Sequence, residues 1–108
     1  MTGEHVQVLT TTEAREEAES IARALTEQRL AACVQIVGPV TSTYRWKGKV
    51  ETAEEWLCII KSRKALYERI EQAIKAIHSY ETPEIIALPI VAGSAAYLNW
   101  LDEELKEA

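Results

Sequence analysis

One short stretch of the sequence gathers three side chains that could do chemistry together. His78, Tyr80 and Glu84 place an imidazole, a phenol and a carboxylate close together in the chain. Lys61 ends a predicted strand that could bring its ammonium group beside them. A mixed polar cluster of this kind is typical of a binding cleft. A capped turn with a structural ion pair between Lys61 and Glu84 explains the same residues equally well, so the pattern alone leaves both interpretations open.

The other reactive side chains indicate less. Cys33 and Cys58 both lie in apolar segments, which favours small buried hydrophobic residues over metal ligands or reactive thiols. His5 stands near the start of the chain, and we assign it no role. The sequence has no glycine-rich phosphate loop, no Gly-x-Ser-x-Gly elbow and no zinc-binding spacing. We therefore do not expect an enzyme, and the alternative is one that uses the polar cluster for general acid–base catalysis.

Composition and charge set the outer limits. The 108 residues are those of one domain, residues 1–108, and the 27% of charged residues is ordinary for a soluble globule. A net charge of −5 argues against nucleic acid as a partner. No apolar run is long enough for a membrane span, so no membrane association is expected. The two cysteines do not form a Cys-x-x-Cys pair and lie in apolar segments, which favours a reducing, cytoplasmic location.

A long hairpin is the dominant predicted element. Two arms rich in β-branched and aromatic residues run from Cys33 to Trp46 and from Val50 to Lys61, joined by a turn at residues 46–49. An arm of about 13 residues spans roughly 43 Å, far more than the domain's expected radius of gyration of about 13 Å. The tip should therefore project and carry Tyr44 and Trp46 into contact with another copy. The alternative is a hairpin interrupted at residues 38–39, whose curled tip packs on its own sheet.

The remaining periodicities complete the fold. They predict a strand over residues 5–10, a helix capped by Thr11 or Thr12 that ends near residue 28, and a second helix capped by Ser62 that reaches His78. A strand over residues 84–88 and a closing helix over residues 93–105 follow. The order β-α-β-β-α-β predicts an α+β, ferredoxin-like sandwich with a long β-hairpin and an added C-terminal helix.

Five motifs in this order make the sequence similar to a known family. They are Leu30-Ala31-Ala32-Cys33-Val34, Ser42-x-Tyr44-x-Trp46-x-Gly48-Lys49, Ile60-Lys61, His78-x-Tyr80-x-x-Pro83-Glu84-Ile85 and Tyr97-Leu98-x-Trp100-Leu101. Together they resemble the CutA family of divalent-cation-tolerance proteins over almost the whole chain. The resemblance implies a PII-like homotrimer with hairpins exchanged between neighbours and a link to tolerance of copper and other heavy metals. We expect Tyr44, Trp46 and Trp100 in the trimer interface.

The resemblance also implies where a metal ion would bind. Some members use a Cys at the end of the first strand and a His-His pair as copper ligands, whereas this chain has Thr10 and Ile77-His78. Binding of copper or another divalent cation should therefore be weak and centred on His78. The leading hypothesis is a signalling module that binds a metal ion or small metabolite in clefts formed by Lys61, His78, Tyr80 and Glu84. A purely structural trimeric interaction module is the alternative.

Overall fold

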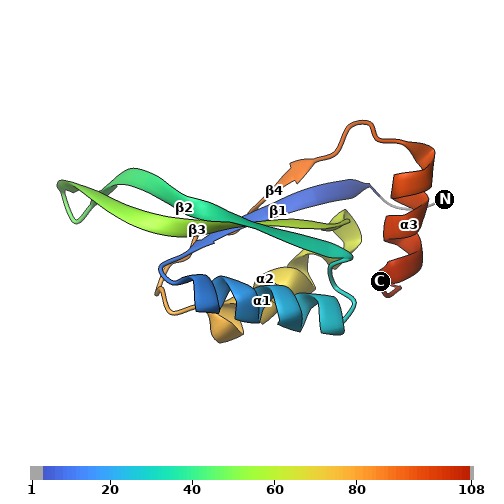
Figure 1. The fold of residues 1–108 in the computed structure, drawn as a ribbon, viewed down its shortest axis with the longest axis horizontal. Helices are drawn as coiled ribbons and strands as arrows, with labels where there is room; N and C mark the ends of the chain where they lie inside the picture. Colours follow the sequence, from blue (N-terminus) through green and yellow to red (C-terminus); the bar gives the residue numbers. More distant parts are fainter. Residues whose placement is uncertain (1–3, 108) are drawn as a thin grey trace.

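The computed structural model describes residues 4–107 and confirms the α+β, ferredoxin-like sandwich (Figure 1). The elements in chain order are β1 His5–Thr12, α1 Arg15–Glu27, β2 Cys33–Trp46, β3 Lys49–Arg63, the 3₁₀ turn η1 Lys64–Leu66, α2 Tyr67–Ile77, β4 Ile86–Pro89 and α3 Ala95–Glu104. The four strands form one antiparallel sheet in the order β2-β3-β1-β4. Among the described residues, no helix is both long and apolar enough to cross a membrane.

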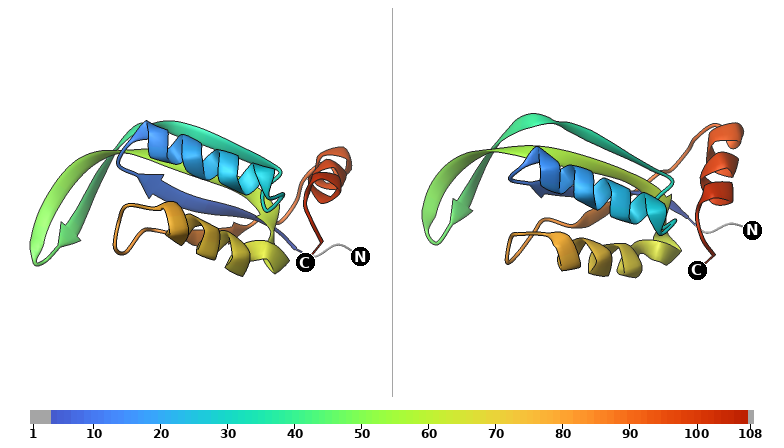
Figure 2. Two further views of the ribbon diagram at one scale, coloured as in Figure 1. Left: turned by 90° about the horizontal axis from the view of Figure 1, so that it is seen from below. Right: turned by 60° about the horizontal axis from the view of Figure 1, so that its bottom comes forward.

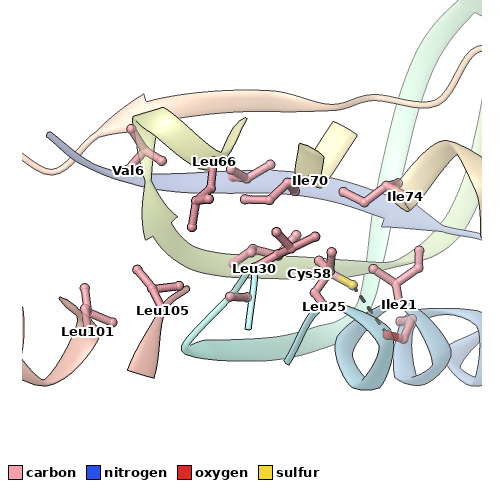
Figure 3. Packing of buried hydrophobic residues seen from close by; sticks show 14 residues of the cluster. Val6, Ile21, Leu25, Leu30, Cys58, Leu66, Ile70, Ile74, Leu101 and Leu105 are labelled. Carbon is pink, nitrogen blue, oxygen red and sulfur yellow. Dashed lines mark hydrogen bonds between the residues drawn. The ribbon is translucent and has the colours of Figure 1, made fainter. Parts of the chain in front are cut away.

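Helices α1 and α2 lie side by side on one face of the sheet, and α3 lies at the end of the sheet where β1 begins (Figures 1 and 2). The strands supply alternating side chains to the helical side, because successive residues of a strand point to opposite faces. In β1, every second residue from Val6 to Thr12 is buried. Figure 3 shows Val6 of β1 in the core with Ile21 and Leu25 from α1 and Ile70 and Ile74 from α2.

The hairpin of β2 and β3 leaves the body of the protein and arches over (Figure 2). The pairing of the two strands is interrupted by a bulge between Val37 and Val40, around the cis Gly38–Pro39 bond. The backbone at Gly38 lies against the indole of Trp56, where a Cβ would be only 2.5 Å from Cε3. The predicted interruption is therefore present, yet Trp46 at the tip stays 45% exposed and does not pack into the core.

Three predicted boundaries were wrong, and tertiary pairing explains each of them. Ser62 is no helix cap: β3 continues through it, since Ser62 pairs with Val6 and its hydroxyl donates to the carbonyl of Leu30. Thr12 belongs to β1 and is paired with Trp56. The last strand begins only at Ile86 and not at residue 84.

The C-terminal helix is attached by polar contacts that the sequence did not predict. Asp102 on α3 accepts a hydrogen bond from Nε2 of His5 at 3.0 Å and from Nη1 of Arg63 at 3.4 Å. Arg29, with φ of 59°, donates to the carbonyl oxygens of Glu103 and Glu104 at the end of the helix. His5, to which we assigned no role, is therefore one of the residues that hold α3 in place.

Candidate functional site

The segment that follows α2 brings two of the predicted site residues together. The α2 helix ends at Ile77, and residues 78–85 cross to β4 at the end of the sheet from which the hairpin projects (Figures 1 and 2). The rings of His78 and Tyr80 are in contact, with centroids 4.8 Å apart. Glu17 on α1 fixes the segment, because its carboxylate accepts hydrogen bonds from the backbone N–H and the hydroxyl of Ser79.

His78 has a fully buried side chain with both ring nitrogens in use. Nε2 lies 2.7 Å from the carbonyl oxygen of Thr11, and because a carbonyl only accepts, this nitrogen carries the proton. Nδ1 accepts a hydrogen bond from the backbone N–H of Tyr80 at 3.1 Å and lies 3.5 Å from a carboxylate oxygen of Glu17. A metal ligand needs a free nitrogen lone pair, and His78 has none in this arrangement. A weak metal site centred on His78 therefore stays a prediction, and it requires that a metal ion displace the hydrogen bond from Tyr80 to Nδ1.

Tyr80 reaches from this segment to a residue that the sequence did not single out. Its hydroxyl donates to Oε2 of Glu55 on β3 at 2.7 Å. Burial, the hydrogen bond to Glu55 and the negative charges of Glu55 and Glu13 raise the pKa of Tyr80 above its usual range. Tyr80 therefore stays a neutral hydrogen-bond donor at physiological pH.

The other two predicted residues do not join this cluster within one protomer. Glu84 is exposed, just before β4, and has no hydrogen-bond or ion-pair partner among residues 4–107. Lys61 pairs with Gln7 on β1, whereas His78 contacts Thr11, four residues along the same strand. The expected position of Lys61 beside His78 was therefore wrong for a single protomer.

The length of α2 explains the separation of Lys61 from His78. Lys61 lies near the start of α2 and His78 at its end, and a helix of 11 residues is about 16 Å long. Nζ of Lys61 instead donates to the side-chain oxygen of Gln35 at 3.0 Å. Lys61 also lines a shallow hollow of about 330 Å³ between the sheet and α3, together with Gln7, Tyr97 and Leu98.

No metal centre is formed by the described part of the chain. Among residues 4–107, no group of three or more His, Cys, Asp or Glu side chains is arranged to hold a metal ion. Thr10, where the sequence resemblance implied that some other members have a cysteine ligand, is buried, and its hydroxyl has no hydrogen-bond partner among these residues. Cys58, paired with Thr10, is buried in the core.

The face of the sheet opposite α1 and α2 carries a mixture of apolar and polar side chains. Directly paired residues of antiparallel strands lie on the same face. One row therefore contains Gln35, Ile59, Leu9 and Ile86, and the next contains Cys33, Lys61, Gln7 and Leu88. Ile86 and Leu88 are 47% and 40% exposed. The expected interface residues are also exposed in one protomer: Tyr44, Trp46 and Trp100.

Comparison with known proteins identifies the family to which the sequence and the fold are similar. The family model of the CutA1 divalent ion tolerance protein matches residues 6–104. A divalent-cation tolerance protein CutA of Thermus thermophilus is 47% identical over 89% of this chain and 93% of its own length. The chloroplastic protein CutA of Arabidopsis thaliana is 44% identical, and this chain spans about half (53%) of it.

Solved structures extend the similarity to the fold. The crystal structure of CutA1 from Oryza sativa matches 99% of this chain and 98% of its own, with 40% identity and a TM-score of 0.95. The Thermus thermophilus structure matches 94% of this chain and 99% of its own, with 44% identity and a TM-score of 0.92. The shared fold, the sequence identity and the span of the family model together lead to one conclusion: this chain belongs to the CutA1 divalent ion tolerance family.

Proposed function

We propose that the protein is a homotrimer that takes part in divalent-cation tolerance by binding a small ligand in clefts between its subunits. The observation that carries this proposal is a set of large apolar side chains that one protomer leaves exposed. They lie on the open sheet face, with Ile86 and Leu88, and on the projecting arm, with Tyr44 and Trp46. Clusters of exposed apolar side chains are typical of sites of association.

The hairpin arm supports exchange between copies. The part of β3 between the hairpin tip and Trp56 pairs with β2 but not with β1. Its other edge therefore has no neighbouring strand among the described residues. At the other end of the sheet, β4 is a four-residue edge strand. Exposed strand edges pair readily with other strands, so an arm of one copy can add to an edge of the next.

Assembly would also complete the cleft. Lys61 lies on the open sheet face, and Tyr80 lies at the base of the arm, so the two cannot meet within one copy. A boundary between two copies can bring Lys61 of one copy to His78, Tyr80 and Glu84 of the other. We propose that the ligand binds there, in the place where the sequence pattern predicted a cleft.

Two measurements test the ligand. Native mass spectrometry of freshly purified protein should show a small molecule that co-purifies with the trimer. Calorimetric titration with Cu²⁺ and Zn²⁺ should give no tight site that depends on His78, since both nitrogens of this ring are in use. Stoichiometric copper binding that disappears in His78→Ala would contradict the proposal and restore His78 as a metal ligand.

We also propose a cytoplasmic location, because the free cysteines Cys33 and Cys58 fit a reducing compartment. A solved relative from Archaeoglobus fulgidus is described as a periplasmic divalent cation tolerance protein. Cell fractionation with antibody detection decides between the two compartments. Recovery of the protein in an osmotic-shock fraction would contradict a cytoplasmic location.

A further inference from the structure

Glu55 is a buried carboxylate without a countercharge. Its residue is only 8% exposed, in β3 opposite Val40 and one position before Trp56, where pairing with β1 ends. Among residues 4–107, its one side-chain hydrogen bond comes from Tyr80, and it forms no ion pair. An ionised carboxylate is costly to bury unless a cation or several hydrogen bonds compensate for the lost water. Tyr80 satisfies one carboxylate oxygen of Glu55, and the other oxygen keeps some contact with solvent and is open to a further partner.

The phenol beside Glu55 is held firmly in place. His78 accepts a hydrogen bond from the backbone N–H of Tyr80, packs against its ring in a tilted arrangement and donates to the carbonyl oxygen of Thr11 on β1. Glu17 holds Ser79, the residue between them. Oε2 of Glu55 is therefore occupied by a fixed donor, and Oε1 is left as an acceptor without a partner among the described residues.

The surroundings of this pair favour positive charge. Burial, the hydrogen bond to Glu55 and the negative charges of Glu55 and Glu13 raise the pKa of Tyr80. The carboxylate of Glu55 lies 2.7 Å from the phenol oxygen, and a negative charge beside an aromatic ring attracts a cation, because the face of the ring is negative as well. Arg15, the basic residue nearest in sequence to Glu13, is already paired with Glu19 and lies over Trp56.

The donors present select the class of cation. A bound metal ion needs three or more ligands held together, and residues 4–107 offer no such group. An ammonium group needs only hydrogen-bond acceptors with a negative charge nearby, which the carboxylate of Glu55 and the hydroxyl oxygen of Tyr80 supply.

We propose that Glu55 and Tyr80 form a binding site for an alkylammonium group. The group comes from a lysine of another copy or from a free amine. The obvious lysine is Lys61, a cation on the open sheet face whose hydrogen-bond partner is the neutral Gln35. This inference rests on the proposed function for the position of the site at a subunit boundary, but the Glu55–Tyr80 pair itself lies within one protomer.

The test compares Glu55→Gln with Glu54→Gln, a matched control on the same strand whose side chain is exposed. Calorimetry with n-butylammonium chloride, against sodium chloride of equal ionic strength, measures binding of a free amine. Light scattering over a dilution series measures assembly of the same two variants, of Lys61→Met and of the double variant Glu55→Gln/Lys61→Met. Circular dichroism confirms that each variant is folded.

Two results would support the site and would identify the source of the cation. For a free amine, the wild type binds butylammonium, and Glu55→Gln weakens this binding by about tenfold or more, the loss expected for a hydrogen bond to a charged group. For a lysine of another copy, Glu55→Gln and Lys61→Met each weaken assembly by a similar factor, and the double variant is no weaker than either. Glu54→Gln stays at the wild-type value in both cases.

The opposite result is equally clear. If the wild type binds no butylammonium and Glu55→Gln assembles like Glu54→Gln, the inference is wrong. Should Glu55→Gln fail to fold, Tyr80→Phe tests the same site, because it removes the phenol oxygen and should lower amine binding or assembly; no change would refute the site. A monomeric wild type would refute the proposed trimer, while the amine titration would still decide this inference.

Discussion

At the scale of single residues, Gly38 has less space for a side chain than Gly48 or Gly93, the other glycines that the structure describes. Its substitution by Ala would place a Cβ 2.5 Å from Cε3 and 2.8 Å from Cδ2 of Trp56, and a rigid indole cannot give way as a flexible chain can. We expect Gly38→Ala to lower the free energy of unfolding by about 1–3 kcal/mol, as overpacking does. Urea denaturation measures this change.

Gly93→Ala is the matched control for that substitution. Its Cβ would meet the flexible side chain of Leu98 at 3.2 Å, and neither glycine has a positive φ. The control should therefore be close to neutral. Equal losses for both variants would show that Trp56 does not restrict Gly38.

Cys58 gives a prediction for alkaline pH. Burial, assisted by the charge of Glu17, raises the pKa of its thiol to about 11. The unfolded thiol ionises near its ordinary pKa of about 8.5, so the stability from this group is complete below that pH and is lost as the pH rises toward the folded pKa. The free energy of unfolding should fall by about 3 kcal/mol over this range.

Urea denaturation at several values of pH checks this prediction. Cys58→Ala should show a smaller alkaline loss than the wild type, although Tyr80 and Tyr67, whose pKa values are also raised, leave part of it. Cys33→Ala should keep the full loss. An unchanged pH dependence in Cys58→Ala would show that the buried thiol is not the titrating group.

The sequence predicted part of the candidate site, and the reasons are specific. His78 and Tyr80 were found because they are neighbours in the chain, and neighbours of a short turn stay together. Glu55 was missed because its contact with Tyr80 joins residues 25 apart, and nothing around Glu55 marks it as buried. Lys61 was misplaced, although the length of α2 alone puts it far from His78.

At the scale of elements, α3 depends on Asp102 for its position. The carboxylate of Asp102 is 17% exposed and joins His5 and Arg63, which belong to β1 and β3. Asp102→Asn removes the charge that partners Arg63 and should lower the free energy of unfolding by about 1–3 kcal/mol, as for a buried hydrogen bond to a charged group. Hydrogen exchange should show faster opening of α3 in this variant.

Glu103→Gln is the control for Asp102→Asn, since the side chain of Glu103 is exposed and forms no hydrogen bond or ion pair with the other described residues. In Glu103→Gln, the backbone amides of α3 should exchange as in the wild type. If α3 opens no faster in Asp102→Asn than in the control, then Leu101 and Leu105, which are buried, hold the helix without help from Asp102.

The elements themselves were largely predictable because each has a strong local pattern. The hairpin was predicted from two long β-branched runs around one turn, and α1 and α2 from their apolar stripes. The ends of the elements were less certain, since pairing decides them: Ser62 looks like a cap in sequence and is a strand residue because β1 lies beside it. The contacts of His5 with α3 join residues 97 apart and leave no local signal.

At the scale of the whole molecule, Trp46 should be a principal contact between copies. It is 45% exposed at the tip of an arm in a molecule whose longest extent is 47 Å. If it fills a pocket on a neighbour, Trp46→Ala should weaken assembly by about 2–4 kcal/mol, the range of interface hot spots. Ile74→Ala should instead cost about 2–5 kcal/mol of protomer stability, because Ile74 lies in the core.

Dilution followed by light scattering separates the two effects. Trp46→Ala should dissociate at higher concentration than the wild type while each protomer stays folded. If Trp46→Ala keeps its assembly intact at nanomolar concentration, the arm is not what holds the copies together.

The molecular mass in solution tests the central claim most directly. Size-exclusion chromatography with light scattering at low micromolar concentration should give about three times the 12.1 kDa of one chain. The thermal midpoint should also rise with protein concentration, because assembly stabilises the folded state by mass action. A mass of one chain, with a midpoint that does not depend on concentration, would contradict the trimer and the cleft between its subunits.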